Sequence, residues 1–236
     1  AVDIIIIGAM AGLIIGVIET TGFGSALTIV LLKVGADSLF LLLVLTAVIS
    51  IILGMGMPTT AIYVLLALMV APPLIKLGID PLAAHLFVLY YGLMSMITPP
   101  VAIAAFTAAK LANSNAMATA VTACRLGWVA YVIPFVFVFS PSLIMRGGTI
   151  EVVVSFVCAV VGVWIVSAGF LGFFMNKLGL LMRAFFVVVG LSLVLPVGVI
   201  EGGTTIRITG ASLAAVILGR EFLMRKRRRV GTQWAE

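Results

Sequence analysis

Two clusters of helix-breaking and hydroxyl residues stand inside long uncharged runs of this sequence. They are residues 54–60 (GMGMPTT) and residues 95–100 (SMITPP). A proline removes its own N–H and displaces the carbonyl four residues earlier, so the second cluster predicts that the carbonyls of Ser95 and Met96 lack helical partners. Freed carbonyls and hydroxyls are hard oxygen ligands, which suit an alkali cation that leaves water. A structural proline kink explains either cluster alone, and two consecutive interruptions favour an ion or substrate site.

Other chemically capable side chains are few. His85 is the only histidine of the chain, and a helix–helix hydrogen bond is its favoured role, with a proton relay as the alternative. Tyr63, Tyr90 and Tyr91 suit either a transport pathway or interfacial packing. The two cysteines, at positions 124 and 158, lack the spacing of a metal site or of a disulfide framework, so packing is expected for both.

The elements that must position these residues are membrane helices. Of the 236 residues, 64% are hydrophobic and 9% are charged, whereas a soluble domain has roughly 25% charged residues. The uncharged runs are long and continuous, which selects α-helices over barrel strands. These runs cover residues 4–18, 39–75, 82–109, 126–145, 152–176, 184–200 and 208–219.

The net charge of +6 reflects a basic C-terminal tail, including residues 225–229 (RKRRR). This cluster directly follows an apolar run, so it predicts a cytoplasmic anchor near anionic lipid and no nucleic-acid partner. If residues 204–224 span the membrane, the basic loops at Lys110 and Arg125 and at Lys177 and Arg183 are also cytoplasmic. The expected location is therefore the cell inner (plasma) membrane, with several spans.

Three segments depart from simple spanning helices. Residues 20–38 predict an interfacial arm helix, with a connecting loop as the alternative. Residues 39–75 predict a re-entrant hairpin whose tip is the first cluster, and two short tilted spans with a tight turn are the alternative. Residues 82–109 predict a helix that is broken at the second cluster.

The stretch GMGMPTTAIYVLLALMVAPPLIKLGIDPLAAHLFVLYYGLMSMITPPVAIAAFTAAKLANS at residues 54–114 resembles the large membrane subunit of TRAP (tripartite ATP-independent periplasmic) transporters. The HLFVLYYG and GMGMPTT motifs and the IPFVFVFSPSLI run at 133–144 are similar in particular to the fused permeases of the TAXI branch. The resemblance covers residues 4–145, and the later helices are similar to the C-terminal extension of such permeases.

This resemblance implies a permease half of the ion-transporter superfamily, driven usually by sodium. Its expected partners are an extracytoplasmic solute-binding protein, a small organic anion as substrate and membrane lipid, with sodium as the coupling ion and no cofactor. The family places ion and substrate near the hairpin tip and the broken helix, which implies the binding residues Gly54, Gly56, Thr59, Thr60, Ser95, Thr98 and Pro99.

The domain organisation follows from these segments. Residues 1–38 are expected to form a spanning helix and the arm helix, and residues 39–125 one half of a transport domain. Residues 126–145 predict another span, and residues 146–236 a C-terminal extension of about three helices. Inverted repeats require a second hairpin and a second broken helix. The first half of the permease is therefore expected to be missing, in agreement with a first residue that is not methionine.

Two other function classes are weaker. An intramembrane enzyme lacks support because HExxH, GxSxG and a pair of buried carboxylates are missing from the sequence. A channel or a non-transporting scaffold remains the alternative, although the sequence contains no TVGYG-like filter.

Overall fold

The computed structural model describes residues 2–174, 178–194, 205 and 208–214. Their regular structure is helical, with no β-strand among them, which confirms the expected all-α fold. Three stretches of this part of the chain are long and apolar enough to cross a membrane: Thr59–Lys76, Ala116–Phe139 and Thr149–Leu171. The chain is an all-α integral membrane protein.

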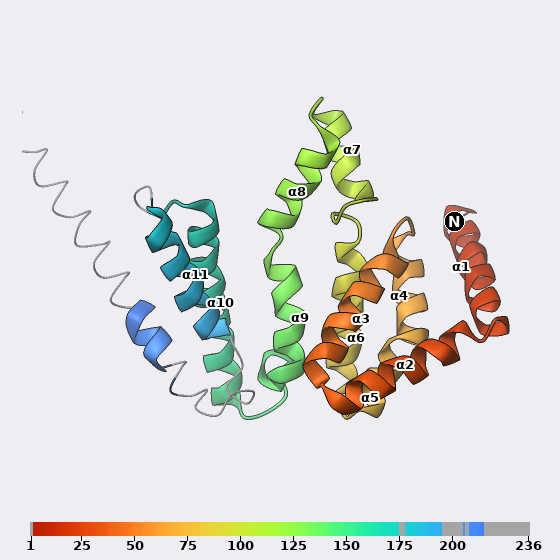
Figure 1. Ribbon diagram of the computed structural model, residues 1–236, viewed down its shortest axis with the longest axis horizontal. Helices are drawn as coiled ribbons and strands as arrows, with labels where there is room; N and C mark the ends of the chain where they lie inside the picture. The colour runs from red at the N-terminus through yellow and green to blue at the C-terminus, as the bar shows by residue number, and fades with distance from the viewer. Residues whose placement is uncertain (1, 175–177, 195–204, 206–207, 215–236) are drawn as a thin grey trace, which may run out of the picture. The chain divides into compact units, whose positions relative to one another are not determined.

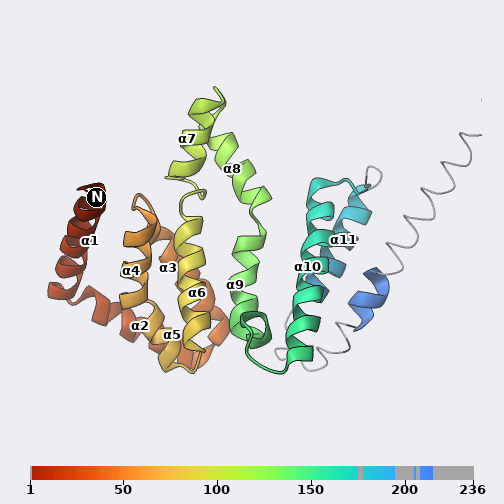
Figure 2. The same ribbon diagram turned by 180° about the vertical axis from the view of Figure 1, so that it is seen from behind.

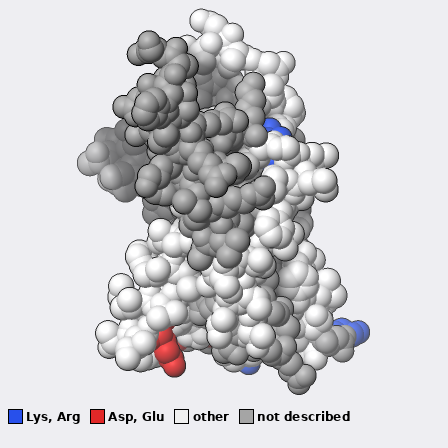
Figure 3. Space-filling view, turned by 90° about the vertical axis from the view of Figure 1, so that its left-hand side faces the viewer, with Lys and Arg blue, Asp and Glu red and all other residues white. Residues whose placement is uncertain are grey.

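Many large apolar side chains lie on the outer surfaces of these helices. Within one helix, Phe156 is 62% exposed and Trp164 is 52% exposed. Figure 3 shows a face on which nearly all described side chains are uncharged. Such a surface suits lipid, because water-soluble proteins cover their helices with many more charged groups.

The chain divides into two compact units, Ala1–Ile144 and Met145–Glu236. The helices of the first unit are α1 (Val2–Thr20), α2 (Phe23–Asp37), α3 (Leu39–Gly54), α4 (Thr59–Met69), α5 (Ala71–Lys76), α6 (Pro81–Met94), α7 (Ile103–Leu111), α8 (Ala116–Leu126), α9 (Val129–Phe139) and the short 3-10 helix η1 (Pro141–Ile144). The second unit contains α10 (Thr149–Leu171) and α11 (Leu180–Val194).

Helices α1 and α2 are separate helices that meet at a bend of 68°. The break lies at Thr21 and Gly22, and α2 ends where Ser38 begins the next helix. The Ser38 hydroxyl accepts the N–H of Leu41 at 3.3 Å, which satisfies one of the free donors at the start of α3. The predicted arm segment 20–38 is thus largely helical, and its position at the membrane interface stays a prediction.

Helix α6 lies at the centre of the first unit. It packs against α3, α4 and α9, and these helices lie beside it in both ribbon views (Figures 1 and 2). Its start is fixed by Asp80, whose carboxylate accepts the N–H of Leu82 at 2.8 Å. Phe87 and Tyr91 of α6 pack against Phe135 of α9, with ring centroids 5.4 and 5.9 Å from that of Phe135. This aromatic cluster joins α6 and α9 into one packed element.

The span expected at residues 126–145 is preceded by a helix that the uncharged runs do not indicate. Helix α8 starts at Ala116, where the Asn115 side chain accepts the N–H of Ala118 at 2.9 Å. Arg125 therefore lies in the last turn of α8, directly before the uncharged run that begins at residue 126. A charged residue at a helix end does not stop a helix, whereas an N-cap residue starts one. Helices α8 and α9 together make the candidate span Ala116–Phe139.

The second unit is a pair of closely packed helices. Gly162 of α10 and Gly190 of α11 bring the two backbones together: a Cβ built at either glycine would lie 2.7 Å from the carbonyl oxygen of the other. The Arg183 side chain donates to the carbonyls of Gly169 and Phe170 at 3.1 and 2.8 Å, near the end of α10. Close approach through small residues is typical of helix pairs in membranes.

Only a few residues of the predicted last span, 204–224, are described. Residue 205 and residues 208–214 are helical. Lys177 and the basic cluster at 225–229 lie outside the described residues.

Candidate functional site

The hairpin tip is a four-residue turn between α3 and α4. Helix α3 ends at Gly54 and α4 begins at Thr59, as the GMGMPTT cluster predicts. Gly56 has a φ of +84°, a left-handed conformation that residues with a Cβ rarely adopt. The turn is exposed at Gly56 and Pro58, and Thr59 and Thr60 at the start of α4 are exposed as well.

Gly54 brings the hairpin tip into contact with the broken helix. A Cβ built on Gly54 would lie 2.8 Å from the carbonyl oxygen of Gly92 and 2.8 Å from the Ser95 hydroxyl. A side chain at position 54 would therefore collide with the end of α6. The end of α3 and the end of α6 thus meet at a point where both helices stop.

The broken helix unwinds through tight turns after Met94. The N–H groups of Ser95, Met96 and Ile97 each donate to the carbonyl three residues earlier, and helical structure resumes at Ile103. The Ser95 hydroxyl is buried and donates to the Gly92 carbonyl at 2.6 Å. The Thr98 hydroxyl donates to the Met94 carbonyl at 2.6 Å. Both predicted hydroxyls of the break are thus held in place by carbonyls of the preceding turn.

One carbonyl that was expected to be free has a partner. The Met96 carbonyl accepts the N–H of Ala104 at 3.0 Å. Pro100 has no N–H and so cannot donate to the Met96 carbonyl, as the fourth residue along a helix would. The chain folds back instead, and the first turn of α7 supplies another donor. The prediction that Met96 offers a loosened carbonyl is therefore wrong in this structure.

Six of the seven predicted site residues fall into three groups, and Gly56 lies in the turn between α3 and α4. Gly54 and Ser95 are in direct contact at the meeting point of α3 and α6. Thr59 and Thr60 are exposed at the start of α4, and their hydroxyls make no hydrogen bond within the described part of the chain. Thr98 and Pro99 are half-buried in the loop between α6 and α7.

His85 lies apart from these residues. It is ten positions before Ser95 on α6, which places it roughly 15 Å away along the helix axis. Its Nδ1 atom is 3.2 Å from the Tyr63 hydroxyl of α4. His85 therefore makes a helix–helix hydrogen bond, and the structure does not bring it to the hairpin tip or to the break.

Three residues beside the break were not expected to contact the site, and only one of them, Cys124, drew attention in the sequence, as a packing residue. Cys124 of α8 donates through its thiol to the Ile97 carbonyl at 3.3 Å, and the Tyr131 hydroxyl of α9 is 2.7 Å from the Thr98 hydroxyl. Gly127, between α8 and α9, leaves room for Ile97, because a Cβ there would lie 3.2 Å from the Ile97 Cδ1 atom. We call Cys124, Gly127 and Tyr131 the junction cluster. Their only sequence signal is a thiol and a phenol seven residues apart in a mostly apolar stretch.

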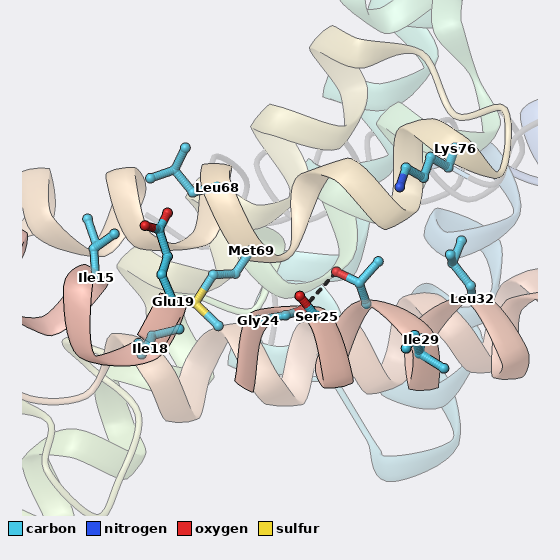
Figure 4. A pocket seen from close by; sticks show the side chains of 11 residues that line it. Ile15, Ile18, Glu19, Gly24, Ser25, Ile29, Leu32, Leu68, Met69 and Lys76 are labelled. Carbon is cyan, nitrogen blue, oxygen red and sulfur yellow. Dashed lines mark hydrogen bonds between the residues drawn. The ribbon is translucent and has the colours of Figure 1, made fainter. Parts of the chain in front are cut away.

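A separate groove of about 590 Å³ lies between α1 and α2 on one side and α4 and α5 on the other (Figure 4). Its lining is mainly apolar, with Glu19 and Lys76 as its charged residues. The Thr28 hydroxyl in this lining donates to the Gly24 carbonyl at 2.9 Å. None of the predicted site residues lines the groove, so it is distinct from the meeting point of the hairpin and the break.

The atoms at the tip and the break that could coordinate an ion are hydroxyl and backbone oxygens. No group of three or more His, Cys, Asp or Glu side chains that could hold a metal lies within the described residues. The tip and the break, at residues 54–60 and 95–100, also contain no charged residue. Uncharged oxygen ligands of this kind suit a hard monovalent cation better than a transition metal.

These features define a class of protein: a multi-pass helical membrane protein in which an interrupted hairpin meets an interrupted helix. Residues 1–152 match the family model for the DctM component of the tripartite ATP-independent periplasmic transporters, and the chain belongs to that family. The expected relationship to TRAP large membrane subunits is thereby confirmed, and the family is one of transporter permeases, not of enzymes. Neither the curated proteins nor the solved structures provided a match.

Proposed function

We propose that this chain is part of a sodium-driven permease that takes up a small organic anion. The observation that carries the proposal is the contact of Gly54 with Gly92 and Ser95, which packs the hairpin tip against the break of α6 in a chain of the DctM family. Secondary transporters bind coupling ions and substrates where discontinuous helices meet near the middle of the membrane.

Sodium is the coupling ion that fits the available oxygens. Thr59 and Thr60 offer exposed hydroxyls at the tip, and Thr98 offers a hydroxyl and a carbonyl at the break. Unwound backbone carbonyls at such breaks replace the water molecules that sodium loses. Proton coupling through His85 is less favoured, because its ring nitrogen already pairs with Tyr63 at a distance from the break.

An anionic substrate fits the start of α4. This helix has eleven residues, and its N-cap, Pro58, provides no side-chain acceptor for the first N–H groups. Free N–H groups and the helix dipole favour negative charge at such an end. The substrate is therefore expected beside Thr59 and Thr60, where it would share the tip with sodium.

The remaining partners follow from the family and from charge. We expect delivery of the substrate by an extracytoplasmic solute-binding protein, and a complementary permease half that supplies the second hairpin and broken helix. The basic C-terminal sequence favours a cytoplasmic C-terminus near anionic lipid of the inner membrane.

The test is sodium binding to the complete permease that includes this chain. Radiolabelled sodium is titrated onto the purified permease and onto its Thr59→Val and Thr60→Val variants, with choline as the competing inert cation. A hydrogen-bonding group that faces a charge contributes about 1.5–3 kcal/mol, so each ligand hydroxyl should cost roughly ten-fold or more in sodium affinity.

Thr107→Val is the matched control, because Thr107 is an exposed residue of α7 whose hydroxyl donates to the Ile103 carbonyl at 2.8 Å. Its sodium affinity should equal that of the parent. Unchanged affinity in both tip variants would refute the assignment of the tip, and uptake that followed a proton gradient alone would refute sodium coupling.

A further inference from the structure

We propose that the junction cluster positions the broken-helix loop and thereby sets the affinity for sodium. Cys124, Gly127 and Tyr131 lie on α8, on α9 or between them, outside both the hairpin and the broken helix. Each one meets the loop at Ile97 or Thr98. The sodium part of this inference rests on the proposed function, whereas the positioning part does not.

The hydrogen bonds of the cluster form a directed chain. The Tyr131 hydroxyl donates to the Cys124 sulfur at 3.3 Å, and the Cys124 thiol donates to the Ile97 carbonyl at 3.3 Å. The Tyr131 hydroxyl also lies 2.7 Å from the Thr98 hydroxyl, which donates to the Met94 carbonyl at 2.6 Å. The cluster therefore contacts the loop at two successive residues, Ile97 and Thr98, and limits how far either residue can move.

Helix α9 is itself held in place, so the loop is tied to a fixed support. The Tyr91 hydroxyl of α6 donates to the backbone carbonyl of Tyr131, and Tyr91 is only 3% exposed. Phe135, one turn further along α9, packs edge-on against Phe87 with ring centroids 5.4 Å apart. The loop therefore lies between the end of α6 and a helix that α6 already holds.

A mutation can remove the interactions of the Tyr131 hydroxyl and keep those of its ring and its backbone carbonyl. Tyr131→Phe removes the hydroxyl that meets Thr98 and Cys124, but it keeps the ring and the backbone carbonyl that accepts from Tyr91. Tyr90→Phe is the matched control. The Tyr90 hydroxyl makes no hydrogen bond within the described residues, and its ring packs edge-on against Phe137 with centroids 5.7 Å apart.

The first readout is hydrogen–deuterium exchange at the amides of residues 95–98, which does not depend on transport. Tyr131→Phe should exchange faster there than the parent, whereas Tyr90→Phe should match the parent. Cys124→Ala should behave like Tyr131→Phe, and Cys124→Ser should restore slow exchange because a hydroxyl can donate to the Ile97 carbonyl. Parent-like exchange in both Tyr131→Phe and Cys124→Ala would overturn the proposal.

The second readout is the sodium concentration that gives half-maximal uptake by the complete permease in proteoliposomes. An interhelical hydrogen bond in a membrane protein contributes about 0.6–1.7 kcal/mol, which predicts a rise of roughly three-fold to eighteen-fold for Tyr131→Phe. Tyr90→Phe should show no rise. Faster exchange with an unchanged half-saturation concentration would overturn the link to sodium.

The two proposals fail in different ways. A parent permease that takes up its substrate without sodium would refute the proposed function, and the exchange data would still decide whether the junction cluster holds the loop. Sodium-dependent uptake by the parent, together with a half-saturation concentration that Tyr131→Phe leaves unchanged, would instead refute only the inference about sodium affinity.

Discussion

Thr46 and Ser50 are two buried hydroxyl residues on α3 whose oxygens have no hydrogen-bond partner in the described part of the chain. Both side chains are 0% exposed. Elsewhere in the structure, helical hydroxyls such as that of Thr28 donate to the carbonyl one turn earlier. A buried hydroxyl without a partner costs free energy, because water no longer satisfies it. These two residues therefore weaken the packing of the hairpin.

We expect Thr46→Val and Ser50→Ala to leave the thermal stability of the permease unchanged or to raise it. Replacement of an unpaired buried hydroxyl by an apolar group of similar shape removes a desolvation cost of about 1–3 kcal/mol. The melting temperature in detergent is the measurement. Ser95→Ala is the contrasting variant, since its hydroxyl donates to the Gly92 carbonyl at 2.6 Å, and it should lower the melting temperature. A loss of stability in Thr46→Val or Ser50→Ala would contradict this account.

Among the contacts between helices, the end of α3 packs closely against the end of α6 at Gly54. The Cβ of an alanine there would lie 2.8 Å from the Gly92 carbonyl and from the Ser95 hydroxyl, closer than ordinary packing allows. The two helix ends would have to separate, and overpacking of this kind typically costs about 1–3 kcal/mol. The hairpin tip would move away from the break.

We therefore expect Gly54→Ala to lower the melting temperature of the permease and to weaken sodium binding. Gly12→Ala is the control, because Gly12 is a helical residue of α1 whose Cβ would meet nothing within 4 Å. That control should be neutral or should stabilise by up to about 1 kcal/mol, the difference in helix propensity between glycine and alanine. If Gly54→Ala matched Gly12→Ala in both measurements, the close contact of α3 and α6 would not matter for the site.

The helix breaks could be predicted from the sequence because glycine and proline act locally. The tip at 54–60 and the break at 95–100 interrupt the helices where those residues stand. Helix α8 does not follow from the uncharged runs, because Arg125 bounds such a run but lies in the last turn of a helix that begins after the Asn115 cap. The junction cluster could not be predicted, because a bond from Cys124 to the carbonyl of Ile97 joins residues 27 apart whose contact depends on tertiary packing.

At the scale of the whole molecule, the chain combines a family unit with a second helical unit. The match to the DctM family covers residues 1–152, and the first compact unit is Ala1–Ile144. The predicted site residues and the junction cluster all belong to that first unit. The helices α10 and α11 form a compact unit with its own buried residues, among them Ile165, Phe186 and Leu193.

We expect a substitution that separates α10 from α11 to have only local effects within the second unit. In Gly190→Leu, the added side chain meets the Gly162 carbonyl and the backbone nitrogen of Val166, which lie 2.7 and 2.8 Å from a Cβ built at that position. The α10–α11 pair should open at a cost of about 1–3 kcal/mol. Hydrogen–deuterium exchange should then rise in both helices and stay at the parent level in α6 and at residues 95–98.

Gly179→Ala serves as the control within the same unit, because its Cβ would meet nothing within 4 Å, and it should change neither exchange nor uptake. Sodium-dependent uptake by the complete permease should remain at the parent level in Gly190→Leu, since the residues proposed to bind sodium lie in the first unit. If uptake were lost while exchange at residues 95–98 stayed slow, the α10–α11 pair would have to take part in transport. The tip and the break would then hold the ion without being sufficient to move it.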